Sequence, residues 1–307
     1  MQNDDQYILY KLFRDHEYVS GVSQTARMTM GAVMDALVAF NGSPEDIRNQ
    51  IIAFIDAIRC SEPRTVPLIN MMLNCENDLK SLNISETTDV QEVKDAIRRV
   101  FSAQIDHLED NISRVVDFGV ECVDDGDFII VYTVSAPVLR ILPEAVKRGK
   151  DFSVLILDQD VRKTGQVLKK MDETGVSYVM APEYGLSHFL EQTNKLFLGA
   201  TAITADSKVV TAAGTANIAS IAHLHHLPVY LFANSLKFSK RIGGEQNIHR
   251  KTKAGSRNGL ACDVISHSHD IVDLKVVDHL ITEHGKIRDI AAYRSQLASG
   301  RDFCRQL

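Results

Sequence analysis

Hydrophobic residues in the first 120 positions recur every three or four residues, a spacing that places them on one face of a helix. The first such stretch stops at Asn41-Gly42, a strong turn signal. A second helix is predicted after Ser43-Pro44, because serine caps helix N-termini and proline suits the first helical position. A long amphipathic stretch from Val93 to Val116 follows. We therefore predict a helical N-terminal domain over residues 1–122.

The pattern changes after Asp124-Asp125-Gly126-Asp127, where short apolar runs begin to alternate with helical segments. Near-continuous apolar runs of this length, separated by helices, are typical of parallel strands buried on both faces. We predict an α/β protein in which the helical domain is followed, over residues 123–307, by a Rossmann-like, mainly parallel sheet with helices on both faces. The predicted strands are 127–134, 152–158, 176–181, 196–203 and 228–233.

Ligands of such sheets bind beyond the carboxyl ends of the strands, so the loops there are the candidate site. One of them, Ala212-Ala213-Gly214-Thr215, opens a helix directly after an apolar stretch. Its free N–H groups and the helix dipole would favour an anion. The turn is equally well an ordinary strand-to-helix connection with Thr215 as the N-cap. The candidate loops are 133–136, 158–165, 199–202, 213–216 and 234–238.

The composition argues against several classes of protein: those that bind nucleic acid through a large basic surface, those that span membranes, and those held together by disulfides. The 307 residues are 45% hydrophobic and 24% charged, as in globular proteins, and the net charge of −6 argues against a large basic field for nucleic acid. No apolar run reaches the roughly 18 residues that a membrane span needs, and the start lacks the pattern of a signal peptide. Five scattered cysteines without a CxxC pair argue against a disulfide framework and favour a reducing, cytoplasmic location.

Standard catalytic motifs are missing from the sequence: there is no GxGxxG, GxxxxGK[ST], GxSxG or HExxH. Histidines cluster at 223–226 and 267–270, in spacings that can ligate metal, but no cysteine or carboxylate set completes either group. We predict neither a metal nor a cofactor. The basic segment 237–257 is either a flexible solvated loop or a lid that closes over a phosphate. Asp158 and Asp160 could act as bases, but no nucleophile adjoins them in sequence.

The run from Ser135 to Leu142, after a predicted strand, resembles a segment of the initiation factor 2B alpha/beta/delta family. That family includes regulatory subunits of the eukaryotic guanine-nucleotide exchange factor, archaeal relatives, and isomerases of ribose 1,5-bisphosphate and methylthioribose 1-phosphate. NSLKF at 234–238 is similar to the family's E-[ST]-[FY]-K-F signature. Three further segments resemble family motifs in the expected order: 152–165, 198–215 and 273–287.

The resemblance also implies which groups this chain lacks. The isomerases' catalytic cysteine aligns with Thr133 and their catalytic aspartate with Thr201. A threonine hydroxyl is not appreciably acidic near pH 7, so we expect no catalytic residue at either position. The family's lysine before the glycine-threonine turn aligns with Ala212 in this chain. Two anion-binding arginines of the family align with Ser20 and Asp160. We expect a phosphate site that is weakened or altered.

The resemblance implies a non-catalytic initiation factor 2B-like regulatory subunit or homologue. The compact chain, which lacks a long disordered N-terminal extension, favours an alpha-type subunit or a free-standing homologue. Such a protein would form a homodimer, contact other subunits of this type or initiation factor 2, and offer a site for a sugar phosphate or a nucleotide. The alternatives are a sensor that binds such a ligand without turnover, and an isomerase whose catalytic groups come from Cys122, Asp158 or Asp160. The candidate ligand-binding residues are Gly21, Ser135, Thr133, Asp158, Thr201, Gly214, Thr215 and Lys237.

Overall fold

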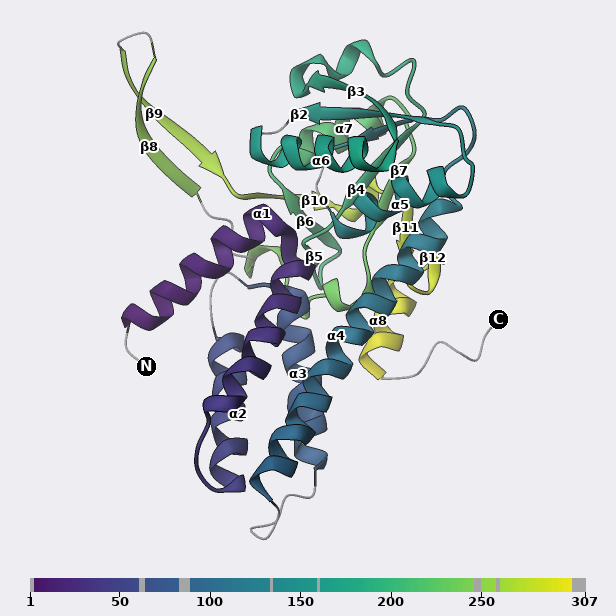
Figure 1. Cartoon of the computed structure of the whole chain (residues 1–307). Helices are drawn as coiled ribbons and strands as arrows, with labels where there is room; N and C mark the ends of the chain where they lie inside the picture. Colours follow the sequence, from purple (N-terminus) through teal and green to yellow (C-terminus); the bar gives the residue numbers. More distant parts are fainter. Residues whose placement is uncertain are drawn as a thin grey trace. The chain divides into compact units, whose positions relative to one another are not determined.

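The structure is a computed structural model, and it describes residues 3–60, 64–82, 89–132, 135–158, 161–245, 250–257 and 260–299. The chain forms two compact units, Met1–Ile112 and Ser113–Leu307 (Figure 1). The division falls inside the long helix α4 (Val90–Val120), ten residues before the end of the expected helical domain. We therefore describe each unit separately.

The first unit is a group of helices that bury one apolar face each (Figure 1). α1 packs against α3, and α3 against α2. The predicted spacing holds, since Ala26 and Leu37 of the first stretch and Ile51 of the second are fully buried. Besides the first part of α4, the helices are α1 (Asn3–Ala36), the short 3-10 helix η1 (Leu37–Ala39), α2 (Pro44–Arg59) and α3 (Val66–Ser81).

Local chemistry explains where α2 begins. The hydroxyl of Ser43 accepts a hydrogen bond from the backbone N–H of Asp46 at 3.2 Å, and the Asp46 carboxylate accepts one from the Ser43 N–H at 2.9 Å. Together with Pro44 at the first helical position, this is a complete capping box, which confirms the predicted start.

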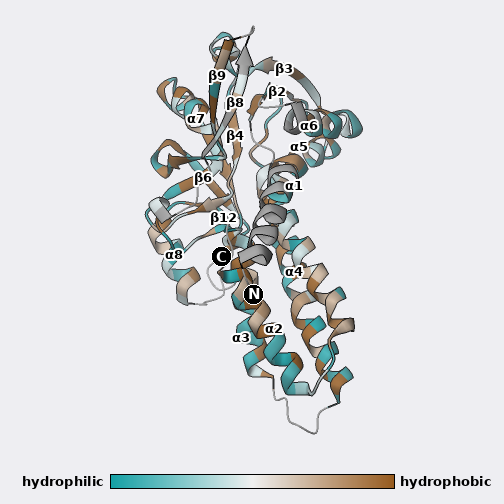
Figure 2. Cartoon of the chain, turned by 90° about the vertical axis from the view of Figure 1, so that its left-hand side faces the viewer, coloured by the Kyte–Doolittle hydropathy of each residue, from teal (hydrophilic) through white to brown (hydrophobic). Residues whose placement is uncertain are grey.

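The second unit contains a seven-stranded sheet in the order β12-β11-β7-β4-β1-β2-β3. All neighbours pair in parallel except β12, which forms an antiparallel hairpin with β11. Figure 2 shows α5 and α6 on one side of the sheet and α7 on the other. The sheet strands are β1 (Phe128–Val131), β2 (Ser153–Asp158), β3 (Ser177–Pro182), β4 (Lys195–Gly199), β7 (Val229–Phe232), β11 (His279–Thr282) and β12 (Gly285–Ile287).

The helices of this unit follow the predicted alternation with strands. The connections are α5 (Ala136–Lys147), α6 (Val161–Thr174), the 3-10 helix η2 (Glu183–His188), α7 (Thr215–Leu224), and the 3-10 helices η3 (Ser235–Lys237), η4 (Gly243–Glu245) and η5 (Leu274–Val276). A last helix, α8 (Ile290–Ser299), was not predicted. No helix of the described ranges is both long and apolar enough to cross a membrane.

Two smaller sheets correct the expectations from sequence. The predicted strand 196–203 is divided, because β4 ends at Gly199 and β5 (Ala202–Ile203) joins a separate sheet in the order β10-β6-β5. That sheet also contains β6 (Lys208–Ala212) and β10 (His269–Asp273). The basic segment 237–257, interpreted above as a loop or lid, contributes strand β8 (Arg250–Arg257), which pairs with β9 (Leu260–His267). The histidines at 267–270 thus lie on β9 and β10 and not in a loop.

Candidate functional site

The sheet changes direction of winding between β1 and β4, and this is where parallel sheets offer a crevice to ligands. From β1 the chain moves to β2 and β3 on one side, then returns to β4 on the other. Ser135 follows β1, caps α5 by accepting the Val138 N–H at 3.3 Å, and is buried. A Cβ atom on Gly199, at the end of β4, would lie 2.3 Å from the Ser135 hydroxyl oxygen. Glycine at 199 therefore permits the close approach of these two strand ends.

Lys237 is the most unusual charged group at this edge of the sheet. It follows β7 in η3, and its side chain is only 2% exposed. Burial lowers its pKa from 10.5 to about 8, and no carboxylate contributes to this shift. Within the residues that the structure describes, its ammonium has no ion-pair partner. A buried cation without a counter-charge is costly, so this position is suited to an anion supplied from outside the chain.

Asn234 lies three residues earlier in the same loop and is fully buried. Neither its Oδ1 nor its Nδ2 atom has a hydrogen-bond partner among the described residues. Buried polar groups are nearly always paired, so an unpartnered amide three residues before a buried ammonium that has no carboxylate neighbour indicates a place for a polar ligand or for water. The loop itself is held firmly, because the backbone N–H of Ser235 donates to both carboxylate oxygens of buried Glu283 at 3.0 Å.

The glycine-threonine turn has the geometry of an anion site, but the carboxylate of Asp270 already occupies it. Gly214 is the N-cap of α7 with φ 94, a left-handed conformation that glycine adopts without strain, so Thr215 is not the N-cap. The backbone N–H groups of Gly214 and Ala216 both donate to the same carboxylate oxygen of Asp270, at 2.8 and 2.9 Å. The Thr215 hydroxyl donates to the carbonyl of Ala212 at 2.6 Å. A ligand anion would have to compete here with a carboxylate of the chain.

A second constraint fixes this turn. The hydroxyl of Tyr132, at the end of β1, donates to Glu183 at 2.7 Å and lies 3.0 Å from the Ala213 carbonyl. A Cβ atom on Gly214 would lie 1.8 Å from that hydroxyl oxygen. The turn therefore packs directly on the side chain that follows β1.

The remaining predicted residues lie on other elements of the fold, and none of them is in the loop of Lys237. Asp158 ends β2, and its carboxylate accepts a hydrogen bond from the Thr164 hydroxyl at 2.7 Å. Thr201 is half-buried after β4, and its backbone N–H donates to Val210 at 2.8 Å. Gly21 lies in the helical unit, where its φ of 76 produces a kink in α1. Thr133 and Asp160 lie outside the described residues.

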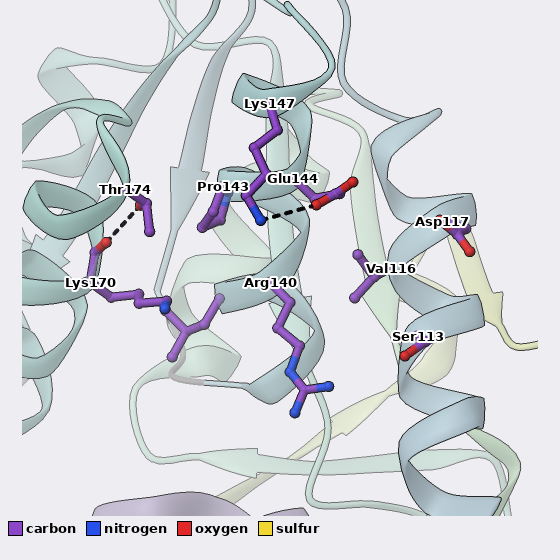
Figure 3. Close-up of a pocket in the computed structure, with 10 residues that line it drawn as sticks. Ser113, Val116, Asp117, Arg140, Pro143, Glu144, Lys147, Lys170 and Thr174 are labelled. Atoms are coloured by element: carbon purple, nitrogen blue, oxygen red, sulfur yellow. Dashed lines mark hydrogen bonds and ion pairs between the residues drawn. The ribbon is translucent and has the colours of Figure 1, made fainter.

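Figure 3 shows a groove of about 340 Å³ in another part of the unit, among α4, α5 and α6. Three of its charged side chains take part in ion pairs. Glu144 pairs with Lys147 at 3.5 Å, and Arg148, which is not part of the lining, binds Glu144 at 3.3 Å and also binds Asp117. The groove lies on the helices and not in the loops that follow the strands. We therefore place the candidate site at Lys237 and Asn234 and not in this groove.

Histidines do not form a metal site in the part of the chain that the structure covers. His223, His225 and His226 are exposed around the end of α7, and the described residues contain no group of three or more His, Cys, Asp or Glu side chains that could hold an ion. Four residues of this region were not predicted from the sequence as site residues: Asn234, Asp270, Tyr132 and Glu283. Only Asn234 carried a signal, since it stands where the family signature has glutamate.

Comparisons with known proteins agree with this fold. The chain is 22% identical over 242 residues to the translation initiation factor eIF2B subunit delta of Dictyostelium discoideum, a match that covers 72% of this chain but only 39% of that protein. It is 25% identical over 218 residues to the ribose 1,5-bisphosphate isomerase of Pyrococcus furiosus, covering 68% of this chain and 67% of the isomerase.

Solved structures show the same architecture. A translation initiation factor eIF-2B from Pyrococcus horikoshii superposes with a TM-score of 0.75 at 18% identity, covering 95% of this chain and 99% of the other. A 5-methylthioribose 1-phosphate isomerase from the same organism gives 0.73 at 14% identity, covering 95% and 88%. The model of the Initiation factor 2 subunit family matches residues 18–289. This chain therefore belongs to the Initiation factor 2 subunit family.

Proposed function

We propose that this protein is a non-catalytic, initiation factor 2B-type regulatory protein with a strand-end site for a sugar phosphate or a nucleotide. The observation that carries the ligand site is Lys237, whose ammonium is buried without a carboxylate neighbour. The unpartnered amide of Asn234, three residues earlier in the same loop, adds support. An anionic group would neutralise the ammonium. A group that both donates and accepts, such as a sugar hydroxyl pair, would satisfy the amide.

The absence of catalysis is supported by the two threonines. Thr133 and Thr201 stand where, by resemblance, the isomerases carry their cysteine and aspartate. Three groups were named as substitutes. Asp160 lies outside the described residues, and neither Asp158 nor Cys122 strengthens the case for an enzyme. The Asp158 carboxylate is engaged by Thr164, and burial raises the pKa of the Cys122 thiol to about 11, which disfavours its thiolate. An isomerase remains the second candidate, because the Pyrococcus furiosus isomerase matches over two thirds of its length.

The proposed assembly is a homodimer that also contacts other initiation factor 2B-type subunits or initiation factor 2, in the cytoplasm. Support comes from the relatives: one solved neighbour is described as a tetrameric eIF2B complex of two beta and two delta subunits from C. thermophilum.

A thermal-shift screen tests the ligand site. The panel contains ribose 1,5-bisphosphate, methylthioribose 1-phosphate, hexose phosphates and nucleoside monophosphates. A ligand at about 100 times its dissociation constant adds roughly 2.7 kcal/mol of stability, which raises Tm by several degrees. We expect such a shift in the wild type and in Lys169→Met, which removes an exposed lysine of α6, and no shift in Lys237→Met. A shift that survives Lys237→Met would refute the proposed site.

Incubation of the same ligands with the purified protein, followed by NMR of the sugar, tests catalysis. We expect the ligands to be recovered unchanged. Conversion of ribose 1,5-bisphosphate or methylthioribose 1-phosphate, abolished by Asp158→Asn, would establish the isomerase instead.

A further inference from the structure

The groove among α4, α5 and α6 is a second cavity of the sheet unit, away from the loops that follow the strands (Figure 3). All of the residues that line it lie within Ser113–Leu307. Its volume of about 340 Å³ falls within the range of cavities that hold small ligands, roughly 300–1,000 Å³. The groove therefore has room for a small organic molecule.

Close packing of α4 on α5 fixes two walls of the groove. A Cβ atom on Gly119 of α4 would lie 2.3 Å from the Cδ1 atom of Ile141, so a glycine is needed where these helices meet. Arg148, at the end of α5, binds Asp117 of α4. The third wall, α6, is anchored by Met171, which is fully buried. A cavity with walls fixed in this way is formed before a ligand binds, which lowers the cost of binding.

The buried part of the lining is apolar. Val116 is 8% exposed, Pro143 is buried and Leu139 is half-buried. A ligand that covers these side chains removes apolar surface from water, which favours binding. The lining therefore suits a ligand with an apolar body.

Lys170 adds a positive charge to the groove. Its side chain is half-buried, and among the residues that the structure describes its ammonium has no ion-pair partner. The two acids of the lining, Asp117 and Glu144, are both bound to Arg148. Figure 3 shows Lys170 reaching from α6 toward α5, and Arg140 extending from α5 into the space between α4 and α6. The groove thus has two cations on its walls for an anionic group.

We propose that this groove binds a phosphate monoester of an apolar group. Such a ligand carries about 1.5 to 2 negative charges at pH 7, which matches the two cations Lys170 and Arg140. Its apolar body contacts Leu139 and Val116. Inorganic phosphate leaves this apolar surface in water, and a neutral ligand leaves the half-buried ammonium without a counter-charge. The groove is separate from the loop of Lys237, so this site does not depend on the proposed function.

Saturation-transfer difference NMR of the full chain with hexyl phosphate tests the proposal. The protein carries Lys237→Met in every sample, so that the strand-end loop does not contribute to binding. We expect saturable binding of hexyl phosphate, with a dissociation constant at least about tenfold lower than that of ethyl phosphate, because each buried methylene strengthens binding. A lack of saturable binding, or equal binding of the two esters, would overturn the proposal.

Two adjacent lysines of α6 provide a matched pair of variants. Lys170→Met keeps the length of the side chain, removes its charge and should raise the dissociation constant of hexyl phosphate about tenfold or more. Lys169 is exposed and pairs with Glu173 at 3.8 Å, so Lys169→Met should leave the constant unchanged within about twofold. Equal effects of the two variants would place the ligand outside the groove.

Leu139→Gln tests the apolar contact. It replaces an apolar lining side chain with a polar one of similar size, and it should reduce the advantage of hexyl over ethyl phosphate to about threefold or less. Leu224→Gln makes the same change at the end of α7, where the leucine is 75% exposed, and should keep the advantage. Circular dichroism checks that each variant is folded. An advantage that survives Leu139→Gln unchanged would contradict the proposed contact.

Discussion

Lys237 and Asn234 show what individual residues contribute at the strand ends. The ammonium of Lys237 is buried where the described residues supply no carboxylate, and its pKa falls to about 8. The amide of Asn234 is buried with both polar atoms unpaired. Each group costs stability in the free protein, and a polar anionic ligand would recover that cost. These two buried groups, the Lys237 ammonium and the Asn234 amide, lead to two predictions.

Removing the Lys237 charge should stabilise the free protein. Its folded pKa is about 8 against 10.5 for the unfolded chain, so the unfolded state binds more protons between these values. Stability of the wild type should therefore rise with pH from 8 to 10.5, by an amount on the order of 3 kcal/mol from this group. Lys237→Met should be more stable at pH 7 and lose this rise, whereas Lys169→Met should keep it. Urea denaturation at pH 7 to 10 measures both; a Lys237→Met protein less stable than wild type at pH 7 would contradict the prediction.

A carboxylate in the loop that carries Lys237 should weaken ligand binding. Asn234→Asp preserves the shape of the side chain and places a negative charge three residues before the lysine, where it would repel an anionic ligand and attract the ammonium. We expect the phosphate-induced thermal shift to disappear while the protein stays folded by circular dichroism. Asn77→Asp makes the same change at an exposed position of α3 and should retain the shift. An unchanged shift in Asn234→Asp would mean that the ligand binds elsewhere.

At the scale of elements, the strand ends are joined by contacts between segments far apart in sequence. Asp270 of β10 caps α7, and Glu283 after β11 holds the loop after β7. α8 adds a further connection, since Arg294 donates to the Thr204 carbonyl and lies 5.2 Å above the ring of Phe238. This helix begins at Ile290, immediately after the residues matched by the family model. The loop that carries Lys237 is therefore supported from several elements.

Loss of the Asp270 carboxylate should weaken α7 and open its N-terminus to anions. Asp270→Ala leaves the N–H groups of Gly214 and Ala216 without their acceptor, at a cost of about 1–2 kcal/mol by analogy with N-cap removal. Inorganic phosphate or sulfate should restore part of this loss, because a helix N-terminus binds anions. Asp35→Ala, at an exposed position of α1, should show neither effect. Thermal melts with and without phosphate measure the difference, and equal melts of the two variants would argue against the cap.

The sequence predicted the elements whose pattern is set by burial. The strands that became β1, β2, β4 and β7 are continuous apolar runs because both of their faces are covered. β3 is also an apolar run, but it lies at the edge of the sheet, where Val179 and Met180 are about half exposed. β8 was not predicted, because RKTKAGSR has neither an apolar run nor an alternating pattern, and its strand character comes from pairing with β9. At the site, Lys237 was predicted because it lies in NSLKF, which resembles the family's E-[ST]-[FY]-K-F signature. The Asp270 cap joins residues more than 50 positions apart, which local patterns do not reveal.

At the scale of the whole sheet unit, an ion cluster of buried Lys195 and Asp127 with exposed Asp124 joins the start of the sheet to its centre. The Lys195 ammonium on β4 binds Asp127 at 2.7 Å, Asp124 at 2.5 Å and the carbonyl of Cys122 at 3.0 Å. Asp127 is only 4% exposed. Lys195 lowers the pKa of Asp124, so the stability from this pair is present at neutral pH and is lost as the pH falls below the unfolded value of 3.8.

Breaking this cluster should destabilise the unit strongly. Lys195→Met leaves the Asp127 carboxylate buried without its partner, and we expect a loss of about 3–5 kcal/mol. Adding Asp127→Asn removes the buried carboxylate that has lost its ion-pair partner, and it should recover at least part of the lost free energy of unfolding. Chemical denaturation of the two variants, with Lys169→Met as the surface control, measures the coupling. A double variant as unstable as Lys195→Met alone would show that packing, and not charge, dominates here.

The low pKa of Lys237 also has a consequence for reactivity. With a pKa of about 8, roughly a tenth of the molecules hold this side chain as a free amine at pH 7, against well under a thousandth for an ordinary lysine. A free amine is a nucleophile, so a small acylating or carbamylating reagent that reaches this buried side chain should modify Lys237 at a lower pH than it modifies the exposed lysines. A bound anion would hold the proton on the nitrogen. Occupancy of the site would then be read directly from the rate at which one side chain is labelled.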